Sequence, residues 1–446
     1  TCIAYRMWQV MQRSGVVQPE DGALQGCNIL FISSNHRLVD QVKRDLRLIR
    51  QAWDDPPLTE EDLKAIDSSH AEALKKHRLA DVPPDAFPLF ITSRHYLHML
   101  EGSLPPDLAF FKRDARGGFC RKKDKGADSV NKGWNFQECE LTHAKFVRDI
   151  WPKIKPKKQK KDDELAPDVV WTEICSHIKG SLEAVESPNG CLSLEGYLAL
   201  GRKRALANFG EDARREVYAV FLEYQAVKRR EEMYDLMDLV YHLYVQLHSR
   251  QYRGPPIHAL FRDEVQDFLQ AELAQDLLLA ANPNALFYAG DSAQTITRGV
   301  HFRFAEVTTM FRNARERYDK QQEDGRSQPE QGGAAASSSG DTHLLAARVE
   351  KKPHEVALAV NYRTHQGILD PAALVVDLIQ KWFSSAIDTL ERERAEITGV
   401  RPLLLGGLEY CKQDLIHLLS DTGSGKVEMG ADQAIIVRNE EAKQRV

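Results

Sequence analysis

The chain has 446 residues, of which 28% are charged and 42% hydrophobic, and its formal net charge is -5. This length suits two or three domains that each bury a core, and the nearly balanced charge neither favours nor excludes binding to nucleic acid. No apolar run approaches the roughly 18 residues that a membrane-spanning helix needs. The seven cysteines include no CxxC pair, which predicts a reduced, intracellular protein without a zinc site.

The first predicted elements are a helix, a strand and a second helix. Residues 1–12 carry apolar side chains at a helical period, residues 28–33 (NILFIS) have the pattern of a buried strand, and a helix is predicted over 36–49. Ser34 and Asn35 lie between the strand and the second helix, where a short polar side chain usually caps a helix N-terminus. We therefore expect a helix cap at this turn.

The middle of the chain, from about residue 51 to 255, is predicted to be mainly helical. Within it, residues 88–100 (PLFITSRHYLHML) indicate a strand that passes into a helix. Apolar residues line one face of each of two long helices, predicted over 212–230 and 232–248. The Gly-Pro-Pro run at 254–256 then breaks the chain and returns it to a sheet.

Two basic stretches occur within this helical region, at residues 112–132 and 153–161, and the second has six lysines in nine residues. Such clusters can contact nucleic-acid phosphates and make binding depend on salt. The lysines of the second stretch are not interleaved with aromatic residues as a base-stacking platform would require, and an acidic run at 162–164 partly cancels their charge. We favour solvated loops or a nuclear import signal, with phosphate contact as the alternative.

Two strand-like runs each end in acidic residues. The first, over 257–261, leads into the pentapeptide DEVQD at 263–267, and a helix is predicted next over 268–281. The second, over 285–289, leads into the sequence GDSAQT at 290–295. Because the carboxyl ends of parallel strands line the crevice where ligands bind, both acidic clusters should face one site.

The chemistry of these clusters suits a magnesium nucleotide. A carboxylate such as Asp263 can hold Mg²⁺ through its water shell, and the adjacent Glu264 can orient or deprotonate an attacking water. Gln294 can sense the terminal phosphate. The alternative is that both clusters are merely exposed acidic turns. Such turns would not be expected to share the order of a strand followed by a carboxylate, or to place a glutamine just behind the second carboxylate.

The same residues resemble a known family. The pentapeptide at 263–267 resembles the Walker B motif of UvrD-like superfamily 1 helicases, and residues 290–296 (GDSAQTI) resemble their third motif. The string NYRTH at 361–365 is similar to their fourth motif. Within the family, the motif sequences are most similar to those of helicase modules in large eukaryotic proteins, including proteins with tetratricopeptide and ankyrin repeats. One departure is Arg262, at a position where an apolar strand residue is usual.

This resemblance implies an α/β fold with the parallel sheets of RecA-like P-loop NTPases and a large helical insertion. Residues 1–50 and 256–319 would form the first RecA-like domain, and residues 51–255 the insertion. Residues 320–342 hold no large apolar side chain, so we expect them to be a disordered loop. Residues 343–446 would then begin a second RecA-like domain.

Arg363 is the residue expected to act from the second domain, between a strand predicted over 355–360 and a helix over 367–383. A guanidinium that reaches the γ-phosphate held by the first domain would act as an arginine finger. A structural salt bridge is the alternative for any single arginine. The run GSGK at 423–426 is not taken as a phosphate loop, because Val427 follows the lysine and no strand of suitable length precedes it.

Two further positions take roles from the resemblance. Thr1 looks like a residue at the end of the family's phosphate loop, so we expect it to bind the nucleotide. The chain would then be a fragment whose loop glycines and lysine lie upstream and whose motifs V and VI lie downstream. Ser34 and Asn35 resemble motif Ia, which touches single-stranded nucleic acid, and this interpretation stands beside the helix cap.

The family therefore implies a helicase or translocase that needs ATP and Mg²⁺ and moves along single-stranded nucleic acid, with DNA favoured over RNA. Asp263 would act on the metal, Glu264 on the water, and Gln294 and Arg363 on the γ-phosphate. Protein partners would bind through regions outside this chain, which alone is expected to be inactive. The alternative is a degenerate helicase-like scaffold that binds nucleic acid or proteins without hydrolysing ATP.

Overall fold

The computed structural model describes residues 2–14, 27–54, 56–113, 139–156, 165–203, 210–295, 297–326, 349, 352–383, 387–402, 436–437 and 440–445. The chain divides into two compact units. The first comprises residues 1–357 and 376–390, and the second comprises residues 358–375 and 391–446. The predicted division into two RecA-like domains stays a prediction.

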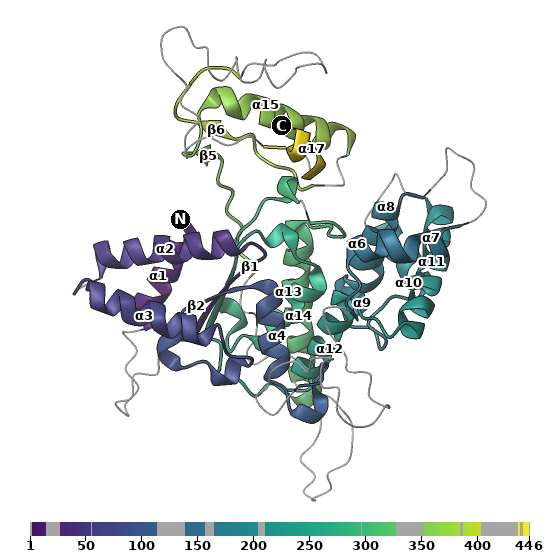
Figure 1. The fold of residues 1–446 in the computed structure, drawn as a ribbon, viewed down its shortest axis with the longest axis horizontal. Helices are drawn as coiled ribbons and strands as arrows, with labels where there is room; N and C mark the ends of the chain where they lie inside the picture. The colour runs from purple at the N-terminus through teal and green to yellow at the C-terminus, as the bar shows by residue number, and fades with distance from the viewer. Residues whose placement is uncertain are drawn as a thin grey trace, which may run out of the picture. The chain divides into compact units, whose positions relative to one another are not determined.

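The centre of the first unit is a parallel sheet, in which β1 and β2 are labelled in Figure 1. The strand order is β2-β1-β3-β4. Its strands are β1 (Ile29–Ser33), β2 (Leu89–Thr92), β3 (Ala259–Arg262) and β4 (Leu286–Tyr288). β1 pairs in parallel with both β2 and β3, so strands that are far apart in the sequence lie side by side. The predicted α/β class, with a parallel sheet and a large helical segment, is confirmed.

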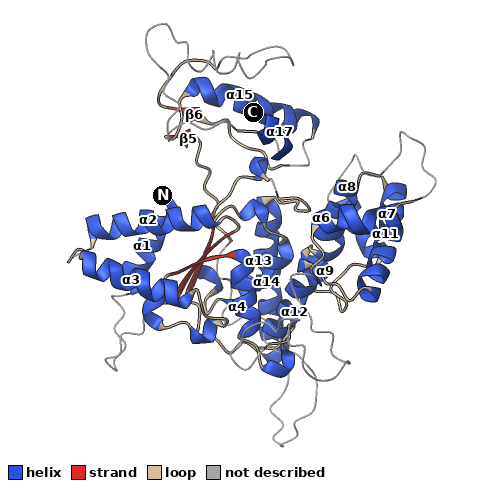
Figure 2. Ribbon diagram, viewed as in Figure 1, coloured by secondary structure: helices blue, strands red, loops and turns tan. Residues whose placement is uncertain are grey.

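Helices cover both faces of this sheet (Figure 2). Side chains alternate along a strand, so Ile29 and Phe31 of β1 point to one face while Leu30 and Ile32 point to the other. The first face packs against α1 (Cys2–Ser14) and α2 (His36–Trp53). The core on the second face includes residues of α4 (Ser93–Gly102), α12 (Leu236–His248) and α13 (Gln270–Leu279). Burial on both faces explains why β1 is a continuous apolar run.

The helix α3 (Glu60–Ala73) holds a buried histidine against β2. His70 Nε2 accepts a hydrogen bond from the backbone N–H of Phe90 at 3.0 Å, which requires that nitrogen to be unprotonated. Burial, followed by the nearby positive charge of Lys43, lowers the pKa of His70 from 6.5 to about 4. Folding of the first unit is therefore linked to the protonation of this side chain.

We expect the free energy of unfolding to fall as the pH drops from 6.5 to 4. His70 binds its proton more readily in the unfolded chain, so its contribution is complete above pH 6.5 and is lost progressively as the pH falls to its folded pKa. Between pH 7 and pH 4 the stability difference between the wild type and His70→Gln should change by ~3 kcal/mol. Denaturant unfolding at both pH values measures this change, and a constant difference would contradict the prediction.

The segment between β2 and β3 builds a second apolar core within the first unit. Its helices are α6 (His143–Lys145), α7 (Trp151–Ile154), α8 (Pro167–Thr172), α9 (Leu182–Val185), α10 (Leu194–Lys203) and α11 (Glu211–Arg230), together with π-helices over Phe146–Ile150 and Glu173–Lys179. The two predicted long helices correspond to α11 and α12. The second begins at Leu236 rather than at residue 232, because Asp235 caps it in a reciprocal capping box with Asp238.

A buried charge network joins the π-helix Glu173–Lys179 to α11 and α12. Lys179 Nζ lies 2.6 Å from Asp235 Oδ1 and 2.7 Å from Asp238 Oδ1. Lys228 Nζ lies 2.8 Å from Asp235 Oδ2. Burial would raise the pKa of the Asp235 carboxyl, but the two lysines outweigh burial and hold this pKa well below its ordinary value. Two positive and two negative side chains thus balance each other inside the insertion.

The helix that follows β4 extends into the segment that was predicted to be a disordered loop. α14 (Phe304–Arg326) packs against α13 and continues through residues 320–326. These residues, KQQEDGR, opened the segment predicted to be a disordered loop, and the rest of that segment lies outside the described residues. The stretch has no large apolar side chain, but lysine, glutamine and glutamate have good helix propensity and can extend a helix that has already formed.

The second unit contains the parallel strands β5 (Val360–Asn361) and β6 (Arg394–Ala395), and α17 (Glu440–Arg445). α15 (Gln366–Trp382) begins in this unit and matches the helix predicted over 367–383. The strand predicted over 355–360 is wrong for most of its length, because the hydrogen-bonded pairing starts only at Val360.

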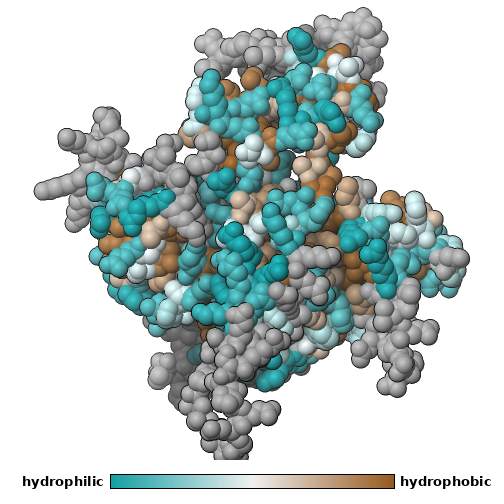
Figure 3. All heavy atoms as spheres, turned by 180° about the vertical axis from the view of Figure 1, so that it is seen from behind, coloured by the Kyte–Doolittle hydropathy of each residue, from teal (hydrophilic) through white to brown (hydrophobic). Residues whose placement is uncertain are grey.

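Three features of the sequence fall outside the described residues. They are Thr1, most of the two basic stretches at 112–132 and 153–161, and the GSGK run at 423–426. Within the described ranges, no helix combines the length and apolar character that crossing a membrane requires. Figure 3 shows one face of the molecule, on which hydrophilic residues predominate and apolar areas are smaller.

Candidate active site

The carboxyl ends of β1, β3 and β4 bring three polar turns to one edge of the sheet. The backbone N–H of Asp263 donates to the carbonyl of Ile32 at 3.1 Å, and the N–H of Ala289 donates to the carbonyl of Arg262 at 2.9 Å. The N–H of Val265 donates in turn to the carbonyl of Ala289 at 2.9 Å. These bonds extend the ladder past the strands and hold the acidic turn after β3 against the turns on either side.

β3 ends on a charged residue that is almost completely enclosed. The Arg262 side chain is 1% exposed, and its Nε and Nη2 donate to the two carboxylate oxygens of Asp276 in α13 at 2.6 and 2.7 Å. The guanidinium carbon lies 4.6 Å from the ring centre of Phe268. Burial would lower the pKa of Arg262, but the paired carboxylate outweighs burial and raises it. The departure from the usual apolar residue therefore leaves the strand intact.

Asp263 is the first carboxylate after β3. It is half-buried, and its Oδ1 accepts the backbone N–H of Glu264 at 3.1 Å. Its second oxygen makes no hydrogen bond within the described part of the chain. Burial raises the pKa of the Asp263 carboxyl above its ordinary value, and the neighbouring Glu264 carboxylate adds to this rise, so the backbone N–H of Glu264 compensates the charge only in part. A hard cation would supply this compensation, so the residue fits Mg²⁺, which is commonly held by one or two carboxylates and by substrate phosphates.

Glu264 has an unusual backbone conformation. Its φ of 54° and ψ of 45° lie in the left-handed region, which is uncommon for residues other than glycine. The short turn Val265–Asp267 follows it. Strain of this kind costs about 1–3 kcal/mol and is found mainly at functional sites, where the surrounding structure holds it in place.

The turn after β4 holds Gln294. Asp291 Oδ1 accepts the backbone N–H of Ala293 at 2.9 Å, and its Oδ2 accepts a hydrogen bond from Gln294 Nε2 at 2.7 Å. The Gln294 side chain is exposed. The backbone N–H of Asp291 is bonded to the Gln266 side chain at 3.0 Å, so the turns that carry Glu264 and Gln294 adjoin each other.

The turn after β1 holds the two residues with alternative interpretations. Asn35 is the N-cap of α2, and its Oδ1 accepts the backbone N–H of Arg37 at 2.9 Å. Ser34 Oγ donates to Asp267 Oδ2 at 3.3 Å, and Asp267 Oδ1 accepts the backbone N–H of Thr297 at 3.3 Å. Both Ser34 and Asn35 are exposed, so the cap leaves this turn open to solvent.

Arg363 lies in the second unit, on a loop shaped by a neighbouring asparagine. Asn361 Oδ1 accepts the backbone N–H groups of Arg363 and Thr364 at 2.8 and 3.0 Å. Its Nδ2 donates to Glu393 at 3.0 Å. The loop therefore has a fixed turn, and it exposes the Arg363 side chain to solvent.

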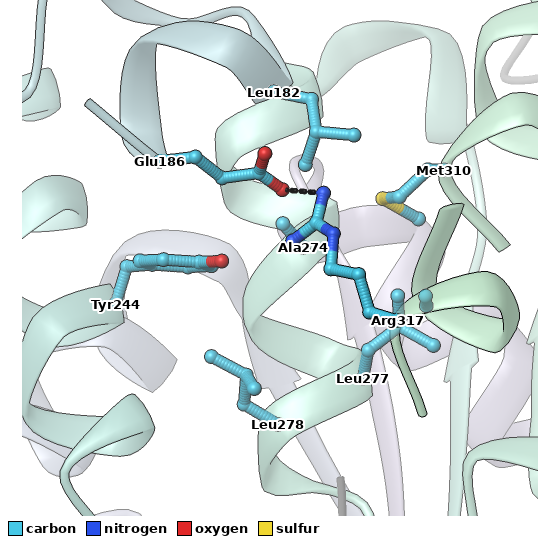
Figure 4. A pocket seen from close by; sticks show the side chains of 9 residues that line it. Leu182, Glu186, Tyr244, Ala274, Leu277, Leu278, Met310 and Arg317 are labelled. Carbon is cyan, nitrogen blue, oxygen red and sulfur yellow. Dashed lines mark hydrogen bonds and ion pairs between the residues drawn. The ribbon is translucent and has the colours of Figure 1, made fainter. Parts of the chain in front are cut away.

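A separate hollow lies between α9, α12, α13 and α14 (Figure 4). Across it, Arg317 of α14 forms an ion pair with Glu186, just after α9. Its lining is otherwise mainly apolar and consists of Leu182, Tyr244, Ala274, Leu277, Leu278, Met310 and Ala314. No predicted site residue lines this hollow.

The sequence predictions assigned no role to two of the residues that shape the site. Gln266 is part of the pentapeptide, and its position two residues after Glu264 is the sequence feature that could have indicated a role in the site. Asp276 gave no signal, because it lies in the middle of a helix and only the fold brings it to Arg262.

Comparisons with known proteins agree with this geometry. Residues 116–318, which include β3 and β4, match the family described as UvrD/REP helicase N-terminal domain. Over 472 residues the chain is 32% identical to the Homo sapiens protein TPR and ankyrin repeat-containing protein 1. That alignment covers 98% of this chain and 14% of the human protein, so the chain spans a small part of its relative. These matches confirm the resemblance seen in the motifs: residues 116–318 of the chain match the N-terminal domain of UvrD/REP helicases.

Proposed function

We propose that this chain is part of an ATP-dependent helicase or translocase, which couples ATP hydrolysis to movement along single-stranded nucleic acid. The observation that carries this proposal is the arrangement of Asp263, Glu264 and Gln294 on adjoining turns at the carboxyl edge of one parallel sheet. The family match supports the same class of activity. DNA is favoured over RNA as the strand.

The chemistry follows from the position of each side chain. Asp263, through the oxygen that Glu264 leaves free, would hold Mg²⁺, which neutralises phosphate charge when it is bound with ATP. The Glu264 carboxylate orients the attacking water and takes its proton. The water oxygen then bonds to the γ-phosphorus, and the bond from that phosphorus to the β–γ bridging oxygen breaks, which releases ADP. Gln294, held by Asp291, contacts the terminal phosphate.

Other residues take the roles that the family implies. Arg363 serves as the arginine finger, and Thr1 binds the nucleotide. Ser34 and Asn35 contact the nucleic-acid strand from the exposed turn after β1. The Asp267 carboxylate accepts hydrogen bonds from Ser34 and from the backbone of Thr297. Nucleic acid bound at the turn after β1 would therefore be connected through Asp267 to the segment that follows Gln294.

Movement along a strand is the test of this function. The whole protein would be bound to fluorescently labelled single-stranded DNA of increasing length and mixed with ATP and Mg²⁺. We expect the time before the protein reaches and leaves the labelled end to lengthen in proportion to the strand, and we expect no such dependence with a non-hydrolysable ATP analogue.

The matched control is RNA of the same sequence, on which slower or absent movement is expected. Binding to DNA that ATP does not affect would contradict the motor and support a scaffold. Movement on RNA but not on DNA would keep the motor and overturn the choice of strand.

A further inference from the structure

Gln266 lies at the junction of the two turns that carry the proposed hydrolytic groups. Its side chain is buried, with 1% of the residue exposed. Its Nε2 donates to Glu264 Oε2 at 2.5 Å, and its Oε1 accepts the backbone N–H of Asp291 at 3.0 Å. One amide therefore uses its donor on the turn after β3 and its acceptor on the turn after β4.

The two partners determine the orientation of this amide. If the amide were reversed, Oε1 would face the Glu264 carboxylate and Nε2 would face the N–H of Asp291, which are two repulsive contacts. The acceptor is a carboxylate oxygen, which accepts a stronger hydrogen bond from an amide than a neutral oxygen does. Gln266 thus has a single favourable position between its neighbours.

Gly290, on the turn after β4, lies so close to Gln266 that a larger residue would not fit at this position. A Cβ at Gly290 would lie 2.4 Å from Gln266 Oε1 and 2.8 Å from Val265 Cγ1. Both distances are shorter than a non-bonded contact allows, so glycine is needed here for the close approach of the two turns. A side chain at position 290 would push the amide away from Asp291.

We propose that Gln266 is a positioning residue that holds the Glu264 carboxylate for attack by water, an inference that rests on the proposed ATP hydrolysis. Glu264 has a strained backbone, and the bond to Gln266 fixes its Oε2 and leaves Oε1 to accept the proton. Asp291, the other partner of Gln266, also holds Gln294. Gln266 thereby fixes the position of the base, Glu264, relative to the phosphate-contacting Gln294.

The test is steady-state ATP hydrolysis by Gln266→Met, which keeps the length of the side chain and removes both hydrogen bonds. We expect kcat to fall by about 10- to 100-fold, as for other supporting residues, while KM for ATP changes by less than about 2-fold. Gly290→Ala should lower kcat in the same way, because it displaces an unaltered Gln266. The double variant should lose little more than either single variant, because both changes break the same contact.

Gln275 offers a matched control. It is also fully buried, and its Nε2 donates to the carbonyl of Val240 at 2.8 Å, away from the three turns. Gln275→Met should lower the thermal midpoint and leave kcat unchanged. A kcat for Gln266→Met that equals that of the wild type in a folded protein would overturn the positioning role.

A readout without turnover separates this inference from the proposed function. In the nucleotide-free protein labelled with ¹⁵N-glutamine, the Gln266 side-chain amide protons should exchange slowly with solvent, and their signal should move in Glu264→Ala. An amide that exchanges rapidly and does not respond would overturn the contact itself. Slow exchange in a wild type that does not hydrolyse ATP would leave the contact standing and would overturn both the proposed hydrolysis and the positioning role.

Discussion

Glu264→Gln is expected to lower kcat for ATP hydrolysis by at least about 100-fold, because an amide cannot take the proton of the attacking water. ATP binding should persist, since the substitution keeps the size of the side chain. The new amide also retains an oxygen that can accept the hydrogen bond from Gln266, so the strained turn is preserved. Steady-state turnover, together with the affinity for a fluorescent ATP analogue, measures both effects.

A control for this variant is Glu272→Gln in α13. Glu272 is buried, and its Oε2 accepts the backbone N–H of Leu269 at 3.0 Å as part of a helix cap. It belongs to α13 and to none of the three turns, so kcat should stay within about 2-fold of the wild type, a change small beside the loss expected for a general base. If Glu264→Gln hydrolysed ATP as fast as this control, Glu264 would not be the base.

The second large effect is expected on stability. Asp276→Asn should lower the free energy of unfolding by about 3–5 kcal/mol, because it leaves the buried Arg262 guanidinium without its counter-charge. Arg262→Met should cost a similar amount by leaving Asp276 unpaired. Replacing both residues, as Arg262→Met with Asp276→Leu, should recover most of the loss. The recovery should fall short by about 1–2 kcal/mol, because the Tyr288 hydroxyl, which donates to Asp276 at 3.0 Å, loses its acceptor.

An exposed pair serves as the comparison. Arg78 makes a similar two-bond contact with Asp81, at 2.7 and 3.0 Å, but the two side chains are 49% and 36% exposed. Arg78→Ala should therefore cost about 1 kcal/mol or less. Denaturant unfolding of all variants tests the contrast. Equal losses at the exposed and the buried pair would show that burial does not determine the cost.

Local patterns predicted the elements around the site well. The apolar runs that became β1 and β3 are continuous because helices cover both faces of the sheet, and Asp263 and Glu264 directly follow β3. The predicted strand over 28–33 and helix over 268–281 differ from β1 and α13 by no more than two residues at each end. Periodicity and motif order were enough, because each depends on residues close together in the sequence.

Contacts between distant segments could not be predicted in the same way. The partner of Arg262 and the lysines that surround Asp235 come from other helices, and no pattern along the chain specifies such pairs. Gln266 was visible in the motif, but its function depends on the turn after β4, which only the sheet order places beside it. The strand expected over 355–360 failed for a related reason, since a strand forms only where a neighbour pairs with it.

ATP hydrolysis by the whole protein, measured with and without single-stranded DNA, tests the central claim most directly. The arrangement of Asp263, Glu264 and Gln294 predicts turnover that requires Mg²⁺ and that rises when single strands are added, with less stimulation by duplex of the same sequence. A folded protein that hydrolyses no ATP under any of these conditions would contradict the claim and leave a helicase-like scaffold in its place.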